Sequence, residues 1–407
     1  MTGKGRGLAV RLALFYAAIF ASLGIYMPFL PVWLAWQGMT PAEIGFLTAA
    51  PMFLRVIATP AIAFFADRRG DLKETILLAS WVGLGAAAVL GGVKGFWPIL
   101  IMILVFQIAQ QTILPLTEAK ALQGIRANGL DYGRIRLWGS VSFIVANLVG
   151  GMVIAHYSGG AVIVMVVMSF TMVVLAAHGL PPRDTGAARA VSRNDPATHD
   201  HPPPKPRMRL RDLRALATAP WFLVLIAASG AIQSSHAVYY AFSAIHWRAQ
   251  GITDGWIGGL WAIGVAAEVA LFAISGTLMR RFGAIGLVII GGAAGVLRWT
   301  VMAFDPSFPI VVIMQLLHAL TFGATFLGTL HILQNSVPDA QAGSAQALHA
   351  ALSPGIIMGV VTVTAGQIYL PLQAASFFVM AALSMIGIVF TVVLARITPA
   401  PVPHEAA

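Results

Sequence analysis

Residues 132–143 read Tyr-Gly-Arg-Ile-Arg-Leu-Trp-Gly-Ser-Val-Ser-Phe and place Arg136 at the start of a long apolar run. Glu118 lies eighteen residues before Arg136, at the end of the preceding apolar run. If the two runs form an antiparallel helical hairpin that turns near residue 127, both side chains lie at similar depth and can face each other. Charged groups inside apolar segments are costly unless paired or hydrated, so both are functional candidates. The alternative is an ion pair that only holds two helices together.

The composition is that of a membrane protein. Of 407 residues, 58% are hydrophobic and only 10% are charged, whereas soluble domains carry about 25% charged residues. A net charge of +10 would suggest nucleic acid in a soluble protein, so the positions of the basic residues matter more than their sum. The absence of cysteine excludes a thiolate metal site or nucleophile and leaves the redox compartment undetermined.

Twelve apolar runs are long enough to cross a hydrocarbon core of about 30 Å. Backbone groups within a bilayer must be satisfied internally, and the alternating pattern of a β-barrel is absent, so the runs are expected to be helices. The fold class predicted is therefore an all-α membrane protein with twelve transmembrane helices. The runs lie near residues 12–36, 43–66, 72–93, 96–124, 133–155, 159–180, 213–245, 254–279, 283–304, 307–336, 342–369 and 371–396.

The basic residues predict the orientation. With Met1 in the cytoplasm, twenty of the twenty-five Lys and Arg residues fall on that side, two fall on the other side and three lie inside runs. This asymmetry predicts that both termini are cytoplasmic, and it explains the net charge without nucleic acid. The opening residues resemble a signal peptide, but the apolar run continues to Trp36 without a convincing cleavage site. We expect an uncleaved first helix.

Residues 181–212 are rich in Pro, Arg and His and lack apolar periodicity, which predicts a flexible cytoplasmic linker. The linker divides the chain into halves of six helices each, residues 1–180 and 213–407. His199 and His201 within it could bind a metal ion, but a solvated low-complexity tract is the favoured interpretation.

A repeat relates the two halves. Residues 37–45 recur as residues 250–258, with five of nine positions identical at an offset of 213. The same offset places Arg55 on Glu268 and Tyr26 on Tyr239. Parallel six-helix repeats are typical of transporters whose binding site lies at the midplane between the halves.

Residues 63–73 resemble the cytoplasmic loop motif of the major facilitator superfamily. Asp67 near a helix end can hold neighbouring helix termini and basic residues, and Gly70 allows a tight turn. We expect Asp67, Arg68 and Gly70 to form a conformational latch rather than a substrate site.

Residues 132–140 resemble the entrance of the fifth helix in the phenylpropionate-permease and lactose-permease branch of that superfamily. In lactose permease, a fourth-helix Glu, an Arg eighteen residues later and an aromatic residue seven beyond form the sugar site. Glu118, Arg136 and Phe143 reproduce this spacing. The resemblance implies that these three residues bind substrate.

The resemblance continues in the second half, where Glu268, Arg298 and His318 match an eighth-helix Glu, a ninth-helix Arg and a tenth-helix His. It implies proton coupling. The acidic residue that carries the proton in lactose permease, three positions after this His, is Thr321 here. The acidic pair of the seventh helix is replaced around His236 and Tyr239.

The coupling group must then be sought elsewhere, and Glu268 is the first candidate. It lies in mid-run, where loss of water favours its neutral form and an approaching Arg136 or Arg298 would favour its charged form. Glu118 ranks second and His318 third. For Arg298, packing or pairing with Glu268 is as well supported as ligand contact.

Other polar residues inside the runs have two interpretations each. Arg55 is expected to line a cavity, although it could snorkel or pair with a carboxylate. Among the buried histidines, His318 and then His236 are functional candidates, whereas His331 and His349 are expected to be structural. Tyr239 and Tyr240 could offer hydroxyls to a ligand or act as interface anchors.

The functional hypothesis is a proton-coupled secondary transporter that works by alternating access. Three intramembrane Arg against two Glu leave a positive excess, which suits an aromatic or other carboxylate solute. The alternative is a proton-coupled sugar or nucleoside symporter. A non-transporting sensor and a membrane enzyme are remote alternatives, the enzyme because clustered motifs such as His-Glu-x-x-His are absent.

The expected partners are a small organic solute, protons and the lipid bilayer. No Walker loop occurs, so ATP is not expected. No cofactor, metal ion or nucleic acid is expected either. The predicted form is a monomer in a bacterial inner membrane.

Overall fold

The computed structural model describes residues 3–69, 72–128, 130–181 and 210–399. Within these ranges, the side chains of residues 3–5, 59–69, 123–128, 210, 212, 213, 339 and 340 are not described. All the regular secondary structure in the described ranges is helical. The predicted all-α fold is therefore confirmed.

The first half contains six long helices, and each coincides with one predicted run. Asp131 caps the start of the fifth helix, where its carboxylate accepts a hydrogen bond from the Arg134 backbone N–H at 3.2 Å. The fourth helix ends at Asn128 and the fifth begins at Tyr132, so the hairpin turns slightly later than the predicted position near residue 127. The helices are α1 (Gly3–Trp36), α2 (Pro41–Arg69), α3 (Leu72–Leu90), α4 (Phe96–Asn128), α5 (Tyr132–His156) and α6 (Ala161–His178).

The spans of the second half are more interrupted. The seventh span comprises α8 (Leu210–Ala217), α9 (Pro220–Ser234) and α10 (Ala237–Ala249), and the eighth and ninth spans are α11 (Asp254–Ala273) and α12 (Ser275–Met302). The tenth comprises α13 (Phe308–Leu316), the π-helical turn η1 (Ala319–Ala324) and α14 (Thr325–Asn335). The last two spans comprise α15 (Asp339–Ala351), the π-helical turn η2 (Leu352–Ile357), α16 (Met358–Leu372), the short turn η3 (Gln373–Ala375) and α17 (Ser376–Ile397).

Eleven stretches in the described residues are long and apolar enough to cross a membrane. The last of them, residues 341–397, contains both the eleventh and the twelfth predicted runs. The eighth run differs from the prediction because α11 ends at Ala273, and α12 itself is kinked at Gly283, whose φ is 66°. Helix α8 begins at Leu210, inside the predicted linker, while residues 182–209 lie outside the described part.

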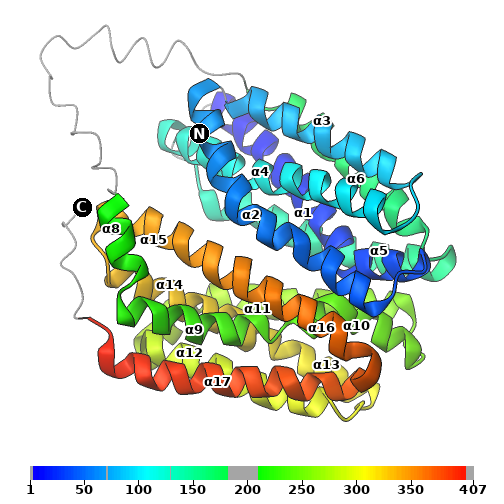
Figure 1. Ribbon diagram of the computed structural model, residues 1–407. Helices are drawn as coiled ribbons and strands as arrows, with labels where there is room; N and C mark the ends of the chain where they lie inside the picture. The colour runs from blue at the N-terminus through cyan, green and yellow to red at the C-terminus, as the bar shows by residue number, and fades with distance from the viewer. Residues whose placement is uncertain (1–2, 70–71, 129, 182–209, 400–407) are drawn as a thin grey trace, which may run out of the picture.

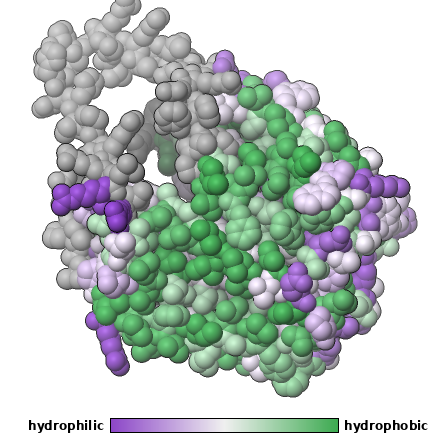
Figure 2. All heavy atoms as spheres, viewed as in Figure 1, coloured by the Kyte–Doolittle hydropathy of each residue, from purple (hydrophilic) through white to green (hydrophobic). Residues whose placement is uncertain are grey.

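The outer surface is that of a bundle immersed in lipid. Figure 2 shows apolar residues across the middle of one face, with hydrophilic residues gathered toward its ends. Large apolar side chains such as Met168, Leu175 and Leu370 point outward. Exposed apolar area of this extent is expected where the solvent is hydrocarbon.

The sequence repeat is also a structural repeat. Gly38 and Gly251, which occupy equivalent positions in the two copies, have φ angles of 83° and 82°. L-residues with a Cβ rarely adopt this backbone conformation, so both copies need glycine at the turn. The corresponding helices α2 and α11 are therefore preceded by turns of the same backbone conformation.

The two halves converge toward the end of the bundle that is far from both termini (Figure 1). There the contacts are between backbones: a Cβ on Gly258 would lie 2.1 Å from the Asn147 carbonyl oxygen, and a Cβ on Gly45 would lie 2.7 Å from the Cα of Gly366. Helix α5 thus crosses α11 closely, and α2 crosses α16 closely. The bundle is packed most tightly between its halves at this end.

Candidate functional site

The first polar cluster lies on the hairpin of α4 and α5. The Nε atom of Arg136 lies 3.7 Å from Oε1 of Glu118, which confirms that the two side chains face each other. The Tyr132 hydroxyl donates a 2.5 Å hydrogen bond to Oε2 of the same carboxylate. The guanidinium of Arg136 stacks 3.9 Å from the centre of the Phe20 ring on α1. The Glu118 carboxylate is thus held by Tyr132 and Arg136. Its contact with Arg136 is through Nε, so the two Nη atoms of the guanidinium are not used by it.

This pair remains partly accessible, with 29% of the Arg136 side chain and 30% of the Glu118 side chain exposed. Phe143, two turns further along α5, is buried. Its backbone oxygen accepts a 2.7 Å hydrogen bond from the Asn147 amide and lies against Gly24 of α1. Phe143 thus belongs to the packing of α5 on α1, and its role in substrate binding stays a prediction.

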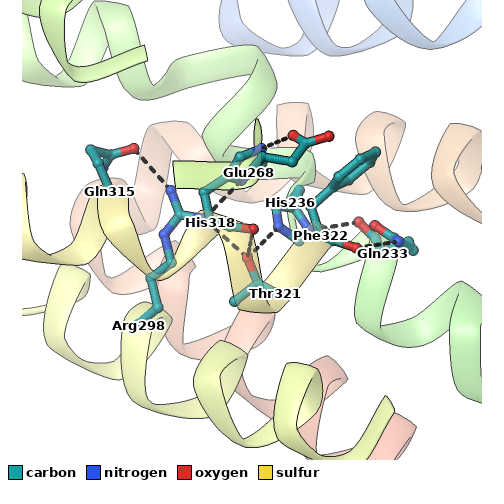
Figure 3. A network of polar contacts seen from close by, with 8 residues as sticks. All are labelled: Gln233, His236, Glu268, Arg298, Gln315, His318, Thr321 and Phe322. Carbon is teal, nitrogen blue, oxygen red and sulfur yellow. Dashed lines mark hydrogen bonds and ion pairs between the residues drawn. The ribbon is translucent and has the colours of Figure 1, made fainter. Parts of the chain in front are cut away.

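Arg298 is at the centre of the second cluster and is fully buried (Figure 3). Its Nη1 donates to Nδ1 of His318 and to Oγ1 of Thr321, both at 3.2 Å, and its Nη2 donates to Oε1 of Gln315 at 2.9 Å. Its guanidinium carbon lies 4.7 Å from the centre of the Tyr239 ring. These partners are uncharged groups and aromatic rings. The structure therefore shows Arg298 packed among neutral groups and not in a direct ion pair with Glu268.

His318 stands between Arg298 and Glu268. A guanidinium can only donate hydrogen bonds, so Nδ1 of His318 must accept and its proton resides on Nε2. That Nε2 lies 3.8 Å from Oε2 of Glu268. Glu268 therefore meets the N–H of a neutral imidazole, whose tautomer is fixed by the buried arginine.

Thr321 extends the network to the seventh span. Nδ1 of His236 donates to the Gln233 carbonyl oxygen at 3.0 Å, so Nε2 of the neutral ring accepts from the Thr321 hydroxyl at 2.9 Å. Thr321 lies in the π-helical turn η1, and such turns are frequent at functional sites. In place of a carboxylate, this position supplies a hydroxyl that links Arg298 to His236.

A cavity of about 540 Å³ lies between the two halves. Its walls come from α1, α2 and α4 of the first half and from α10, α15 and α16 of the second. Arg55 is the only charged side chain among its lining residues, and no described residue forms an ion pair with it. Arg55 thus lies in the cavity wall as expected, and its role in substrate binding stays a prediction.

The same cavity distinguishes the two neighbouring tyrosines of α10. Tyr240 lines it and also stacks on His236, with 5.5 Å between ring centres. Tyr239 is buried against Trp261, with 4.7 Å between ring centres. Tyr240, rather than Tyr239, therefore connects the cavity to the network around Arg298.

The remaining predicted residues lie elsewhere. His331 is exposed on α14, and His349 on α15 lies 3.0 Å from the hydroxyl of Ser229 on α9. Gly70 and the side chains of Asp67 and Arg68 are outside the described part of the structure, so the latch stays a prediction. Sequence reasoning did not assign roles to Phe20, Tyr132 or Gln315, because a polar or aromatic residue inside an apolar run gives no sign of its partner.

Two repeated halves of apolar helices around a shared cavity define a membrane transporter of the two-half type. A family model described as the MFS_1 like family matches residues 9–380 of the chain. The chain therefore belongs to this branch of the major facilitator superfamily and is a multi-pass membrane transporter, not an enzyme.

Several relatives extend over nearly the whole chain. It is 32% identical over 380 residues to the probable 3-phenylpropionic acid transporter of Escherichia coli (strain K12), covering 92% of this chain and 94% of the relative. It is 25% identical over 389 residues to the maltose permease of Geobacillus stearothermophilus, covering 94% and 93%. The crystal structure of the nucleoside transporter NupG shares the fold, with a TM-score of 0.81, 16% identity and coverage of 96% and 99%.

We expect the Glu118→Gln and Arg136→Gln variants to lose solute binding while keeping a thermal stability near that of the unchanged protein. Both side chains are partly exposed, so each partner can be hydrated when the other is removed, and the helices should not separate. Ligand binding and thermal unfolding of the same detergent samples would check this. A large loss of thermal stability with binding retained would assign the pair to helix packing instead.

Proposed function

We propose that this protein is a proton-coupled secondary transporter of a small aromatic monocarboxylate similar to phenylpropionate. It would work by alternating access in a bacterial inner membrane, with both termini in the cytoplasm. The observation that carries the proposal is the unpaired guanidinium of Arg55 in a cavity with no other charged lining residue in the described part of the chain.

The distribution of charge supports an anionic solute. Glu118 faces Arg136, and Glu268 meets the network around Arg298 through His318. Arg298 is fully buried among neutral partners, whereas Arg55 lines the cavity and has no carboxylate partner among the described residues. A substrate carboxylate would neutralise it and could use both arms of the guanidinium fork.

The rest of the wall supports an apolar substrate body. Most lining residues are apolar, and two tyrosine rings, Tyr26 and Tyr240, come from opposite halves. Binding pockets for small molecules commonly combine such apolar walls with a few polar groups that fix orientation. The relative from Escherichia coli is named as a probable transporter of 3-phenylpropionic acid, which has this combination of a ring and a carboxylate.

For proton coupling, Glu268 fits best among the candidates. It is less exposed than Glu118, with 19% of its side chain exposed against 30%, and its partner is a neutral histidine rather than a cation. Glu268 lies on α11, which crosses α5 of the other half closely, so movement of the halves would change its environment. We infer that Glu268 binds the coupled proton in one access state and releases it in the other.

The test is uptake into proteoliposomes. We expect 3-phenylpropionate to be taken up, with stimulation by an inward proton gradient, and 3-phenylpropionamide to compete about 100-fold less well because it cannot neutralise Arg55. The amide has nearly the same shape, so it isolates the effect of charge. Equal binding of the amide, or of a neutral sugar or nucleoside, would contradict the proposal.

A further inference from the structure

We propose that an alanine face of α15, formed by Ala347, Ala350 and Ala351, limits the size of the substrate body. This inference rests on the proposed transport of a monocarboxylate and assigns a specificity-determining surface in the same cavity. The carboxylate would be held by the first half through Arg55. The body would then lie against the alanine face of the second half.

The three alanines lie on one face of the helix. Their spacing of three and four residues brings them to the same side of α15, and all three line the cavity. Ala347 and Ala350 are exposed, although they lie well inside the eleventh apolar stretch. Their methyl groups therefore border open space between the halves rather than filling a core.

Two contacts hold this face in position. On another side of α15, Nε2 of His349 lies 3.0 Å from Oγ of Ser229, which ties the helix to α9. Beyond the C-terminal end of α15, a Cβ on Gly355 would lie 2.9 Å from Cγ2 of Val56. Val56 is the neighbour of Arg55 on α2, so η2, which follows the alanine face, packs on the turn of α2 that carries Arg55.

The opposite walls are built differently. The first half contributes longer aliphatic side chains, including Leu23, Met52 and Leu114, together with Arg55. Alanine has the smallest side chain with a Cβ, so the alanine face leaves space that a larger side chain would fill. A larger residue there would remove room from the substrate body without touching the carboxylate anchor.

The inference can be tested with Ala350→Leu and Ala347→Leu in the purified full-length protein in nanodiscs. The measured quantity is the ratio of the affinities for 4-phenylbutyrate and benzoate, two acids that share a carboxylate and a ring but differ in length. Both variants should lower this ratio at least about tenfold, because misfit of a single methylene in an apolar pocket costs at least that factor. Thermal unfolding would be followed in parallel, and two variants guard against one that does not fold.

Gly343→Leu is the matched control on the same helix. A Cβ added to Gly343 would meet no other part of the protein within 4 Å, and Gly343 does not line the cavity. The ratio of the two affinities in this variant should equal that of the unchanged protein. An unchanged ratio in both folded alanine variants, or equal weakening of both acids, would overturn the inference while leaving carboxylate transport intact. If the unchanged protein binds neither acid, the proposed function fails, and the inference fails with it.

Discussion

Glu268→Gln should abolish accumulation of the solute driven by an inward proton gradient, while exchange of solute down its own gradient continues. Glutamine keeps the shape and the hydrogen-bonding capacity of the side chain but cannot bind and release a proton at this position. The contact with Nε2 of His318 can persist through the amide oxygen, so the network around Arg298 should remain folded. Radiolabelled counterflow and gradient-driven uptake in the same proteoliposomes would separate the two activities.

His318→Ala serves as the comparison variant for this result. His318 is held as a neutral acceptor of Arg298, so it is not expected to carry the proton. Glu118→Gln is unsuitable here because it is expected to lose solute binding itself. Accumulation retained by Glu268→Gln but lost in His318→Ala would show that the assignment is wrong. If neither variant changes the pH dependence of uptake, proton coupling itself is contradicted.

Arg55→Gln should weaken binding of 3-phenylpropionate on the order of 100-fold, since the variant leaves a carboxylate without a cation in a site of low polarity. Binding of the neutral amide should change little, so the selectivity of the cavity for charge would disappear. Arg55→Lys should recover part of the affinity because it restores the charge but not the planar fork. Direct binding to the purified protein would measure all three.

A suitable control is Arg280→Gln, because Arg280 is an exposed arginine whose Nη2 donates to the Thr277 hydroxyl at 3.1 Å, and it does not line the cavity. Its removal should leave acid binding unchanged. Equal loss in the control would point to a general electrostatic effect rather than to a contact at Arg55. Unaltered acid binding in Arg55→Gln would shift the carboxylate site to Arg136.

Features that depend on distance along a helix could be predicted from the sequence. Glu118 and Arg136 flank one turn, so the sequence predicts that they can face each other, and the structure has them 3.7 Å apart, although the turn lies closer to Arg136 than to Glu118. The repeat likewise predicted equivalent backbones, which Gly38 and Gly251 confirm. Periodicity and spacing carry such information because a helix has a fixed rise per residue.

Features that depend on the rotation of a helix about its own axis could not be predicted from the sequence. Adjacent residues point about 100° apart on a helix, so which of Tyr239 and Tyr240 reaches the cavity depends on how α10 packs. The breaks at η1 and η2 add to this uncertainty, because each π-helical turn shifts the face presented by all later residues. The burial of Arg298 among neutral partners could not be predicted either, because it depends on which helices pack around α12 and not on the residues next to Arg298 in the sequence.

The glycine contacts between the halves have a consequence for the energetics of the proposed alternating access. Where Gly45 meets Gly366 and Gly258 meets Asn147, the touching surfaces are backbones, so closing this end would immobilise few side chains and opening it would release few. The attraction at these crossings then comes from dispersion and weak Cα–H···O contacts. Little side-chain entropy would therefore enter the free-energy difference between the two access states at this end, which leaves less for the differential binding of a solute to offset.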